Sequence, residues 1–352
     1  MQDDVFRVGV TRDIRRPDGS LAFAPIADLD ALDRPGIAWR FLEEDPRPLR
    51  PELIEDLDGL YHFSSQVTAE SLDGVERLAV VARQGVGLDF VDLDACTERG
   101  IAVTITPGGV TRPMASAAAT LILALAHRLP DRQRAFRAAD WGEGRFRPFG
   151  IGLTGRTLGV IGFGRIGREV SRLLAPWELR VLVAGRGRVE EAGVEQVELD
   201  ELLAGSDVVV VACPLTDETR GLLDARRLAL MRPTALLVNI ARGPIVDQAA
   251  LVAALREGRI AGAGLDVVDP EPSARDDPLL ALPNVVGAPH SLGYTDELVR
   301  GCVREACDAL LAVARGQVPH NVANPAVLDS RLFRAKLGVR GALLPDGRGG
   351  RV

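Results

Sequence analysis

The sequence predicts an α/β protein built on parallel β-sheets. Short apolar runs of strand type alternate with stretches of helical spacing along most of the 352 residues, a pattern typical of parallel sheets covered by helices. One strand-to-helix transition, TLGVIGFGRIGREV at residues 157–170, passes through three closely spaced glycines. The length allows two domains, each with its own hydrophobic core.

Four strands are expected before residue 110. They span residues 5–10, 57–63, 78–82 and 101–105, with helical spacing at 69–75. Prolines between residues 35 and 51 mark loops. After the fourth strand, Thr111 is the expected N-cap of a helix that holds Pro113 in its first turn and runs to about His127. This helix is apolar nearly all round, which predicts a buried position.

The second half repeats the alternation of strands and helices. The expected strands are 157–161, 180–184, 207–212, 235–240 and 285–288, and the expected helices run from the glycine turn to about Leu174, then over 248–256 and 295–315. Beyond Lys336 the chain is rich in glycine and arginine, and we expect a disordered tail.

Composition disfavours several classes of function. The formal net charge of −7 argues against nucleic acid or an anionic membrane as the main partner. The apolar stretch 115–126 is too short to span a bilayer, and the N-terminus has no signal-peptide pattern. The four cysteines have no paired spacing, which suits a reducing compartment, so a cytoplasmic location is expected. The four histidines lack metal-ligand spacing, and no metal is expected.

Residues 130–150 are rich in arginine and carry Trp141, Phe146 and Phe149 between the charges. Such a mixture is also found in nucleic-acid-binding patches. Because the chain is acidic overall, we interpret the segment as an arm that packs on a second subunit, and we expect a homodimer.

The glycine turn predicts a dinucleotide site. Gly162 permits the tight turn, Gly164 lets the backbone approach a pyrophosphate, and Gly167 lets the helix pack on the strand. The free N–H groups at the helix start then face an anion. A purely structural turn with the same glycines is the alternative interpretation.

Three chemically capable residues follow expected strand ends in the second half: Arg242, Glu271 and His290. Ligands of open parallel sheets lie at the carboxyl ends of the strands. A surface arginine, a solvated glutamate and a core histidine are the alternatives for each residue alone, but their joint placement favours an acid–base site. In the first half, Arg83 begins the run RQGVGLD, whose glycines and N–H groups could hold a carboxylate, or could simply form a turn.

With these residues in place, the sequence resembles the D-isomer-specific 2-hydroxyacid dehydrogenase family. The resemblance covers roughly residues 55–325 and is carried by TLGVIGFGRIG (157–167), CPLTDET (213–219), NIARGPIVD (239–247), GAGLDVVDPEP (262–272) and NVVGAPH (284–290). It implies two Rossmann-like or flavodoxin-like domains with a cleft between them. The substrate domain would be 1–106 plus 295–335, the dinucleotide-binding domain 107–294, and the tail 336–352.

The resemblance also implies roles. His290 would exchange a proton with the substrate oxygen, and Glu271 would hydrogen-bond His290 and favour its protonated form. Arg242 would bind the substrate carboxylate and polarise the keto group. Backbone around Val86 and Gly87, beside Arg83, would take the other side of the carboxylate.

Asp266 would orient the nicotinamide carboxamide, and 213–219 would line the ribose and pyrophosphate. The residues expected around the cofactor, from the glycine turn and the resemblance together, are Gly162, Gly164, Arg165, Ile166, Gly167, Arg186, Cys213, Pro214, Thr219, Ile240, Ala241, Arg242, Asp266, His290 and Gly293.

Two features depart from the family pattern. The position after the second strand, where an acidic residue usually holds the ribose hydroxyls of NAD, is Gly185. Arg186 and Arg188 could pair with a 2′-phosphate, which favours NADP(H) over NAD(H); solvated arginines and use of both cofactors are the alternative. The second departure is Ala115-Ser116 in the buried helix, where members of the family often have Ala-Glu. The segment before it carries Arg112, which either reads a second anionic group or is solvated.

The leading hypothesis is therefore an NAD(P)-dependent oxidoreductase of a small 2-keto or D-2-hydroxy acid. Glyoxylate or hydroxypyruvate reductases and phosphoglycerate dehydrogenases are the relevant types in the family. One alternative is a dehydrogenase of an unusual small anion, such as formate or a phosphonate, on the same fold. Another is a non-catalytic NAD(H)-sensing binding protein.

Overall fold

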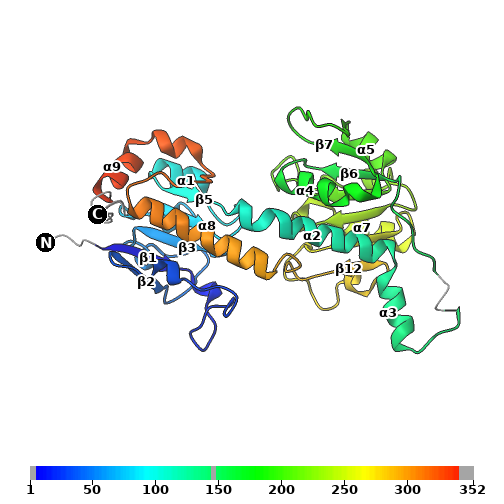
Figure 1. Cartoon of the computed structure of the whole chain (residues 1–352), viewed down its shortest axis with the longest axis horizontal. Coiled ribbons are helices and arrows are strands. Elements are labelled where there is room, and N and C mark those ends of the chain that lie inside the picture. The colour runs from blue at the N-terminus through cyan, green and yellow to red at the C-terminus, as the bar shows by residue number, and fades with distance from the viewer. Residues whose placement is uncertain (1–4, 144–147, 341–352) are drawn as a thin grey trace, which may run out of the picture. The chain divides into compact units, whose positions relative to one another are not determined.

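The computed structural model describes residues 5–143 and 148–340, and the chain divides into two compact units (Figure 1). Unit 1 consists of Met1–Val110 and Thr295–Val352, and unit 2 consists of Thr111–Tyr294. Each unit contains one parallel sheet with helices against it. The α/β class predicted from the sequence is confirmed.

Unit 1 has a five-stranded sheet in the order β2-β1-β3-β4-β5, and all neighbouring strands are parallel. Its strands are β1 (Phe6–Val10), β2 (Ile37–Phe41), β3 (Gly59–His62), β4 (Val80–Arg83) and β5 (Ala102–Thr104), and its helices include α1 (Leu93–Glu98), α8 (Asp296–Ala314) and α9 (Arg331–Arg340). The four predicted strands are confirmed. β2 has no counterpart in the prediction, because it is a half-exposed edge strand that pairs with β1 and lacks the apolar run of a central strand.

The tail predicted from Lys336 was wrong for residues 336–340, which complete α9. Phe333 and Leu337 of this helix are buried, and Lys336 Nζ donates to the carbonyls of Leu78 (2.7 Å) and Arg99 (2.8 Å). An apolar helix face and a satisfied lysine thus hold the segment in place. The rest of the predicted tail, 341–352, lies outside the described residues.

Helix α2 (Pro107–Ala126) begins before the predicted N-cap Thr111, which lies inside the helix together with Pro113. Proline is tolerated in the first turn because its missing N–H needs no partner there, and Gly108 N–H donates to the Glu305 carboxylate at 3.2 Å. This external acceptor replaces the cap expected from Thr111. Of the helices in 5–143 and 148–340, α2 alone is long and apolar enough to cross a membrane, but most of that stretch is buried, as in a core helix of a soluble protein.

Unit 2 has a seven-stranded parallel sheet in the order β12-β11-β10-β9-β6-β7-β8. Its strands are β6 (Thr157–Ile161), β7 (Arg180–Ala184), β8 (Val194–Gln196), β9 (Val208–Val211), β10 (Leu236–Asn239), β11 (Gly262–Leu265) and β12 (Val285–Gly287), and its helices are α3 (Leu129–Arg137), α4 (Arg165–Leu174), α5 (Leu199–Gly205), α6 (Ala225–Leu228) and α7 (Gln248–Arg256). The five predicted strands and the helices at α4 and α7 are confirmed.

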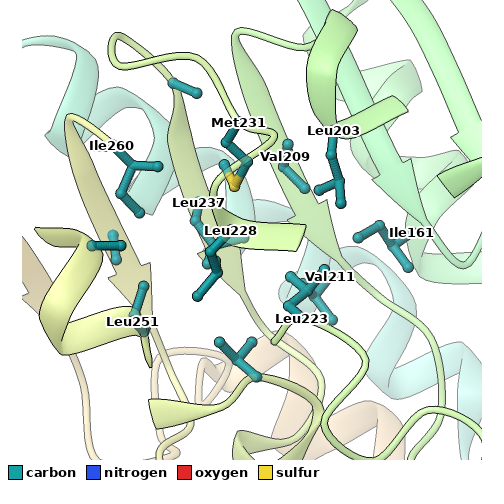
Figure 2. Packing of buried hydrophobic residues seen from close by; sticks show 14 of the residues in the cluster. Ile161, Leu203, Val209, Val211, Leu223, Leu228, Met231, Leu237, Leu251 and Ile260 are labelled. Atoms are coloured by element: carbon teal, nitrogen blue, oxygen red, sulfur yellow. The ribbon is translucent and has the colours of Figure 1, made fainter. Parts of the chain in front are cut away.

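Both faces of this sheet are buried, which explains its nearly continuous apolar strands. Val209 and Val211 of β9 join Leu237 in a core that includes Leu203 and Leu228 (Figure 2). The alternate residues of β9 pack into a second core that includes α2. β6 lies between β7 and β9, and the chain adds further strands outward on both sides of it, so the strand order reverses at β6. Ligands of open parallel sheets bind at such a point.

Candidate active site

The turn after β6 has the geometry of an anion-binding strand-to-helix turn. Gly162 has φ +92°, and a Cβ on Gly167 would lie 2.5 Å from the Gly162 carbonyl oxygen, so both positions require glycine. A Cβ on Gly164 would have no atom within 4 Å. Gly164 is the N-cap of α4 and offers no side-chain acceptor to the N–H groups of Arg165 and Ile166. The residues therefore fit a bound phosphate group at this helix start.

The segment after β9 packs directly on this turn. A Cβ on Gly162 would meet backbone atoms of Cys213, whose thiol is largely buried, and burial raises its pKa to about 11. Thr219 Oγ1 accepts from Thr216 N (2.7 Å) and donates to the Pro214 carbonyl (2.8 Å). These contacts hold the segment 213–219 beside the glycines.

Gly185 directly follows β7, so no carboxylate occupies this strand end. Arg186 forms an ion pair with Glu218 (3.2 Å), and both side chains are about three-quarters exposed. Arg188 pairs with Glu190 at 3.0 Å. Exposed ion pairs of this kind contribute little stability. An anion with more charge than one carboxylate can therefore displace Glu218 from Arg186.

His290 and Glu271 form the acid–base pair expected from the sequence. His290 Nδ1 lies 2.9 Å from Glu271 Oε2, and Glu271 Oε1 accepts the Val268 N–H at 3.1 Å. Burial raises the pKa of Glu271, but the hydrogen bonds from His290 and Val268 and the positive charges of His290 and Arg242 outweigh burial and leave that pKa below its usual 4.5. Glu271 is therefore a carboxylate at neutral pH.

Arg242 reaches the same cluster from the turn after β10. Buried Asn239 holds this turn, since its side chain donates to the Arg242 carbonyl (2.9 Å) and accepts from Ala241 N (3.0 Å). A Cβ on Gly243 would collide with the Val268 carbonyl. The turn that carries Arg242, Ala241 and Ile240 thus lies against the backbone that supports Glu271. The importance of Asn239 and Gly243 was missed at the sequence level, although both belong to the NIARG motif.

Asp266 holds the turn that carries His290. It is 1% exposed; its Oδ1 accepts from Ser291 N and Leu292 N, both at 2.9 Å, and its carbonyl accepts from His290 N at 2.8 Å. His290 has φ +51°, an uncommon value for a residue with a side chain. Burial raises the pKa of Asp266, against the lowering effect of the two N–H groups. Gly293, which follows, is buried.

In unit 1, the predicted residue Arg83 ends β4, and Val86 and Gly87 lie on the loop that follows. Arg83 donates to carbonyl groups of its own loop, and its guanidinium carbon lies 5.8 Å from the ring centroid of Phe63. Phe63 stacks edge-to-face with Phe23 at 6.2 Å. Phe63 follows β3 at the same edge of the sheet, and no pattern in the sequence singled it out.

Arg112 pairs with Glu169 at 2.9 Å, and Glu169 also holds Arg172. This ion pair favours neither of the two interpretations based on sequence, an anion reader or a solvated arginine. Within 5–143 and 148–340, no group of three or more His, Cys, Asp or Glu side chains could hold a metal ion.

Comparisons with known proteins identify similar chains. A family model described as D-isomer specific 2-hydroxyacid dehydrogenase, NAD binding domain, matches residues 119–291. A glyoxylate reductase of Thermococcus onnurineus is 40% identical over 303 residues, which cover 83% of this chain and 90% of that protein.

Two solved structures have a similar fold over most of the chain. The NADPH-dependent glyoxylate/hydroxypyruvate reductase of Sinorhizobium meliloti has a TM-score of 0.77 and 29% identity, covering 91% of this chain and 98% of its own. The D-lactate dehydrogenase of Aquifex aeolicus, complexed with NAD and lactic acid, has a TM-score of 0.78 and 28% identity, covering 90% and 99%.

Proposed function

Because the chain belongs to the D-isomer-specific 2-hydroxyacid dehydrogenase family, and is thus an NAD(P)-dependent oxidoreductase of 2-keto or 2-hydroxy acids, we propose that it reduces a small 2-keto acid with NADPH. Glyoxylate and hydroxypyruvate are the proposed substrates. The observation that carries the proposal is the 2.9 Å contact between His290 Nδ1 and Glu271 Oε2, beside Arg242.

The proposed mechanism assigns one task to each side chain. Glu271 accepts the Nδ1–H of His290, which favours the imidazolium and leaves the Nε2–H to protonate the keto oxygen. Arg242 binds the substrate carboxylate and polarises the keto group by charge-assisted hydrogen bonds. The backbone N–H groups at Val86 and Gly87 take part in binding the carboxylate. The nicotinamide cofactor supplies the hydride.

We propose that unit 2 binds the cofactor through the glycine turn and segment 213–219, and that NADP(H) is preferred. Gly185 supports this preference because it offers no carboxylate to a ribose 2′-hydroxyl and does not repel a 2′-phosphate. Arg186 and Arg188 supply positive charge at the same strand end. Use of both cofactors is the alternative.

The proposed assembly is a homodimer in the cytoplasm. Phe136, Trp141 and Phe149 of the arm are each more than half exposed, an apolar surface that a second subunit would cover. All four cysteines are free, as in a reducing compartment. Light scattering during size-exclusion chromatography tests the assembly: Trp141→Glu should shift the dimer toward monomer.

The central experiment follows absorbance at 340 nm with NADPH, and separately with NADH, against a panel of 2-keto acids. Wild type is compared with His290→Ala. NADPH oxidation that exceeds NADH oxidation and disappears in His290→Ala supports the proposal. A preference for NADH would contradict the cofactor assignment alone. Binding of cofactor without turnover of any 2-keto acid would favour the sensing protein, and turnover of formate or a phosphonate would favour an unusual anion.

A further inference from the structure

Arg83 is a buried cation whose donors are directed at its own loop. It is the last residue of β4, at the carboxyl edge of the unit 1 sheet, and is 8% exposed. Its Nε donates to the Gly87 carbonyl at 3.0 Å, and its Nη1 donates to the Gln84 carbonyl. Burying a charge requires such partners. The side chain therefore fixes both ends of the loop 84–87.

The middle of the loop is held from two sides. Gly85 has φ +128°, a backbone conformation that favours glycine, and a Cβ there would lie 3.2–3.3 Å from three guanidinium atoms of Arg83, which would have to shift slightly. On its other side, Gly85 N donates to Thr106 Oγ1 (2.7 Å), and Thr106 N donates to the Gly85 carbonyl (3.0 Å). Arg83 and Thr106 are thus two braces of one short loop.

These braces determine the direction of the N–H groups. In a planar trans peptide, the N–H of one residue points opposite to the carbonyl of the residue before it. Thr106 binds the Gly85 carbonyl, so the Val86 N–H points away from Thr106; Arg83 binds the Gly87 carbonyl, so the Leu88 N–H points away from Arg83. In the described part of unit 1, the N–H groups of Val86, Gly87 and Leu88 have no acceptor. These three successive N–H groups are therefore available to an anion.

We propose that Arg83 is a positioning residue for the substrate carboxylate: it holds the loop 84–87 in shape, and the backbone N–H groups of Val86, Gly87 and Leu88 bind the anion. Arg83 itself does not contact the substrate. The proposal rests on the proposed function, since it takes the anion to be the carboxylate of the 2-keto acid. It revises the expectation that Arg83 is a direct ligand.

The test measures carboxylate binding separately from cofactor binding. Oxamate, a non-reducible analogue of a 2-keto acid, is titrated into the NADPH-loaded protein, and NADPH itself is titrated by its fluorescence. In Arg83→Met, the Kd of oxamate and the KM of the keto acid should rise about tenfold, while the Kd of NADPH stays within about twofold. Arg83→Lys should restore only part of the affinity, because one ammonium cannot reproduce the planar fork that reaches two carbonyls.

A double-mutant cycle separates positioning from direct contact. Thr106→Val removes the hydroxyl that holds Gly85 and carries no charge, so it should also weaken oxamate binding. If both residues brace one loop, Arg83→Met combined with Thr106→Val should be clearly less than additive in oxamate Kd. Additive losses, or an unchanged Kd in Arg83→Met, would overturn the proposal.

Arg77→Met is the matched control. Arg77 precedes β4 at the opposite edge of the same sheet and pairs with Asp58 at 2.9 Å. This variant should lower the melting temperature and leave the Kd of oxamate unchanged. A general loss of stability therefore cannot imitate the expected result. Wild-type protein that binds NADPH but neither binds oxamate nor turns over any 2-keto acid would overturn the proposed function itself.

Discussion

The two sheets follow the same strand order over five strands and are built alike at their amino edges, yet their carboxyl edges differ. β2-β1-β3-β4-β5 of unit 1 corresponds to β7-β6-β9-β10-β11 of unit 2. Asp58, before β3, accepts the Arg7 N–H at 2.8 Å, and Asp207, before β9, accepts the Thr157 N–H at 3.0 Å. At the carboxyl edge, Arg83 is folded onto its own loop, whereas Arg242 lies half-buried beside Glu271.

This difference separates the amino edges, which hold the sheets together, from the carboxyl edges, which carry the candidate functional residues. In both units the amino edge is a structural device that ties neighbouring strands together. At the carboxyl edge, unit 1 offers backbone N–H groups, whereas unit 2 offers the hydrogen-bonded pair of His290 and Glu271, the Arg242 cation and the glycine turn. Variants at the unit 2 edge should therefore affect catalysis, variants at the unit 1 edge should affect substrate binding, and variants at either amino edge should affect stability alone.

His290→Ala should have the largest effect. A positioned general acid contributes about 10²–10⁴-fold to the rate, so kcat should fall by about that factor with little change in the Kd of NADPH. Steady-state kinetics and fluorescence titration measure the two quantities. A loss of NADPH binding equal to the loss of rate would mean that His290 supports the fold of the cofactor site instead of the proton transfer.

Gly185→Asp should reverse the cofactor preference. A Cβ at this position would have its nearest neighbours at 3.7 Å, so the side chain fits. The new carboxylate can bind the ribose hydroxyls of NADH and repel the 2′-phosphate of NADPH, which should shift the ratio of kcat/KM values about 10–100-fold toward NADH. Gly185→Asn is the matched control of similar size without charge, and it should shift the ratio much less.

Glu271→Gln should lower kcat with little change in the Kd of NADPH. The pKa of Glu271 is below its usual 4.5, so the wild-type side chain is a carboxylate throughout the neutral range and accepts a charge-assisted hydrogen bond from His290 Nδ1. Glutamine keeps the size of the side chain but removes its charge. Because the carboxyl is protonated only as pH falls below its usual value, the ratio of wild-type to variant kcat should be constant across the neutral range and shrink only in acid. Equal kcat values in the two proteins at neutral pH would exclude Glu271 from the proton-transfer step.

The sequence predicted the local parts of this arrangement well. The glycine turn, Arg242 and His290 each lie at the end of an expected strand, whereas Glu271 was found through the motif GAGLDVVDPEP. β11 was not recognised as a strand, because Gly262 and Gly264 have low strand propensity. Glycine at position 264 is required by a tertiary contact, because a Cβ there would lie 2.9 Å from Leu121 Cβ of α2.

Other parts of the site depend on contacts between distant residues. Arg83 was expected to face a substrate, and only the backbone path through Gly85 shows that its guanidinium turns inward. Thr106 follows a different strand, and nothing in its own neighbourhood marks it as a partner of Gly85. Asp266 was expected from the sequence to orient the cofactor. Only the structure shows that its Oδ1 accepts hydrogen bonds from the N–H groups of Ser291 and Leu292, which are distant in the sequence.

The smallest expected effects belong to Asp58→Ala and Asp207→Ala, which test whether the amino edges are equivalent. Each substitution leaves a strand N–H and at least one arginine without their acceptor, so each should cost about 1–3 kcal/mol of unfolding free energy. Hydrogen exchange should show the loss of protection mainly in the sheet of the mutated unit, with kcat unchanged. Loss of protection in both sheets to the same extent would contradict this independence.

The pH dependence of the Asp207 variant sharpens this last test. Burial raises the pKa of Asp207, but the Thr157 N–H and the hydrogen bonds and charges of Arg156 and Arg232 lower it further, to below its usual 3.8. A carboxyl whose pKa is lower in the folded state stabilises fully above its unfolded value and loses this contribution as pH falls through its folded value. The stability difference between wild type and Asp207→Ala should therefore be constant near neutrality and shrink only in strong acid. A difference that shrinks already between pH 5 and 7 would mean that another group, and not this carboxylate, ties β6 to β9.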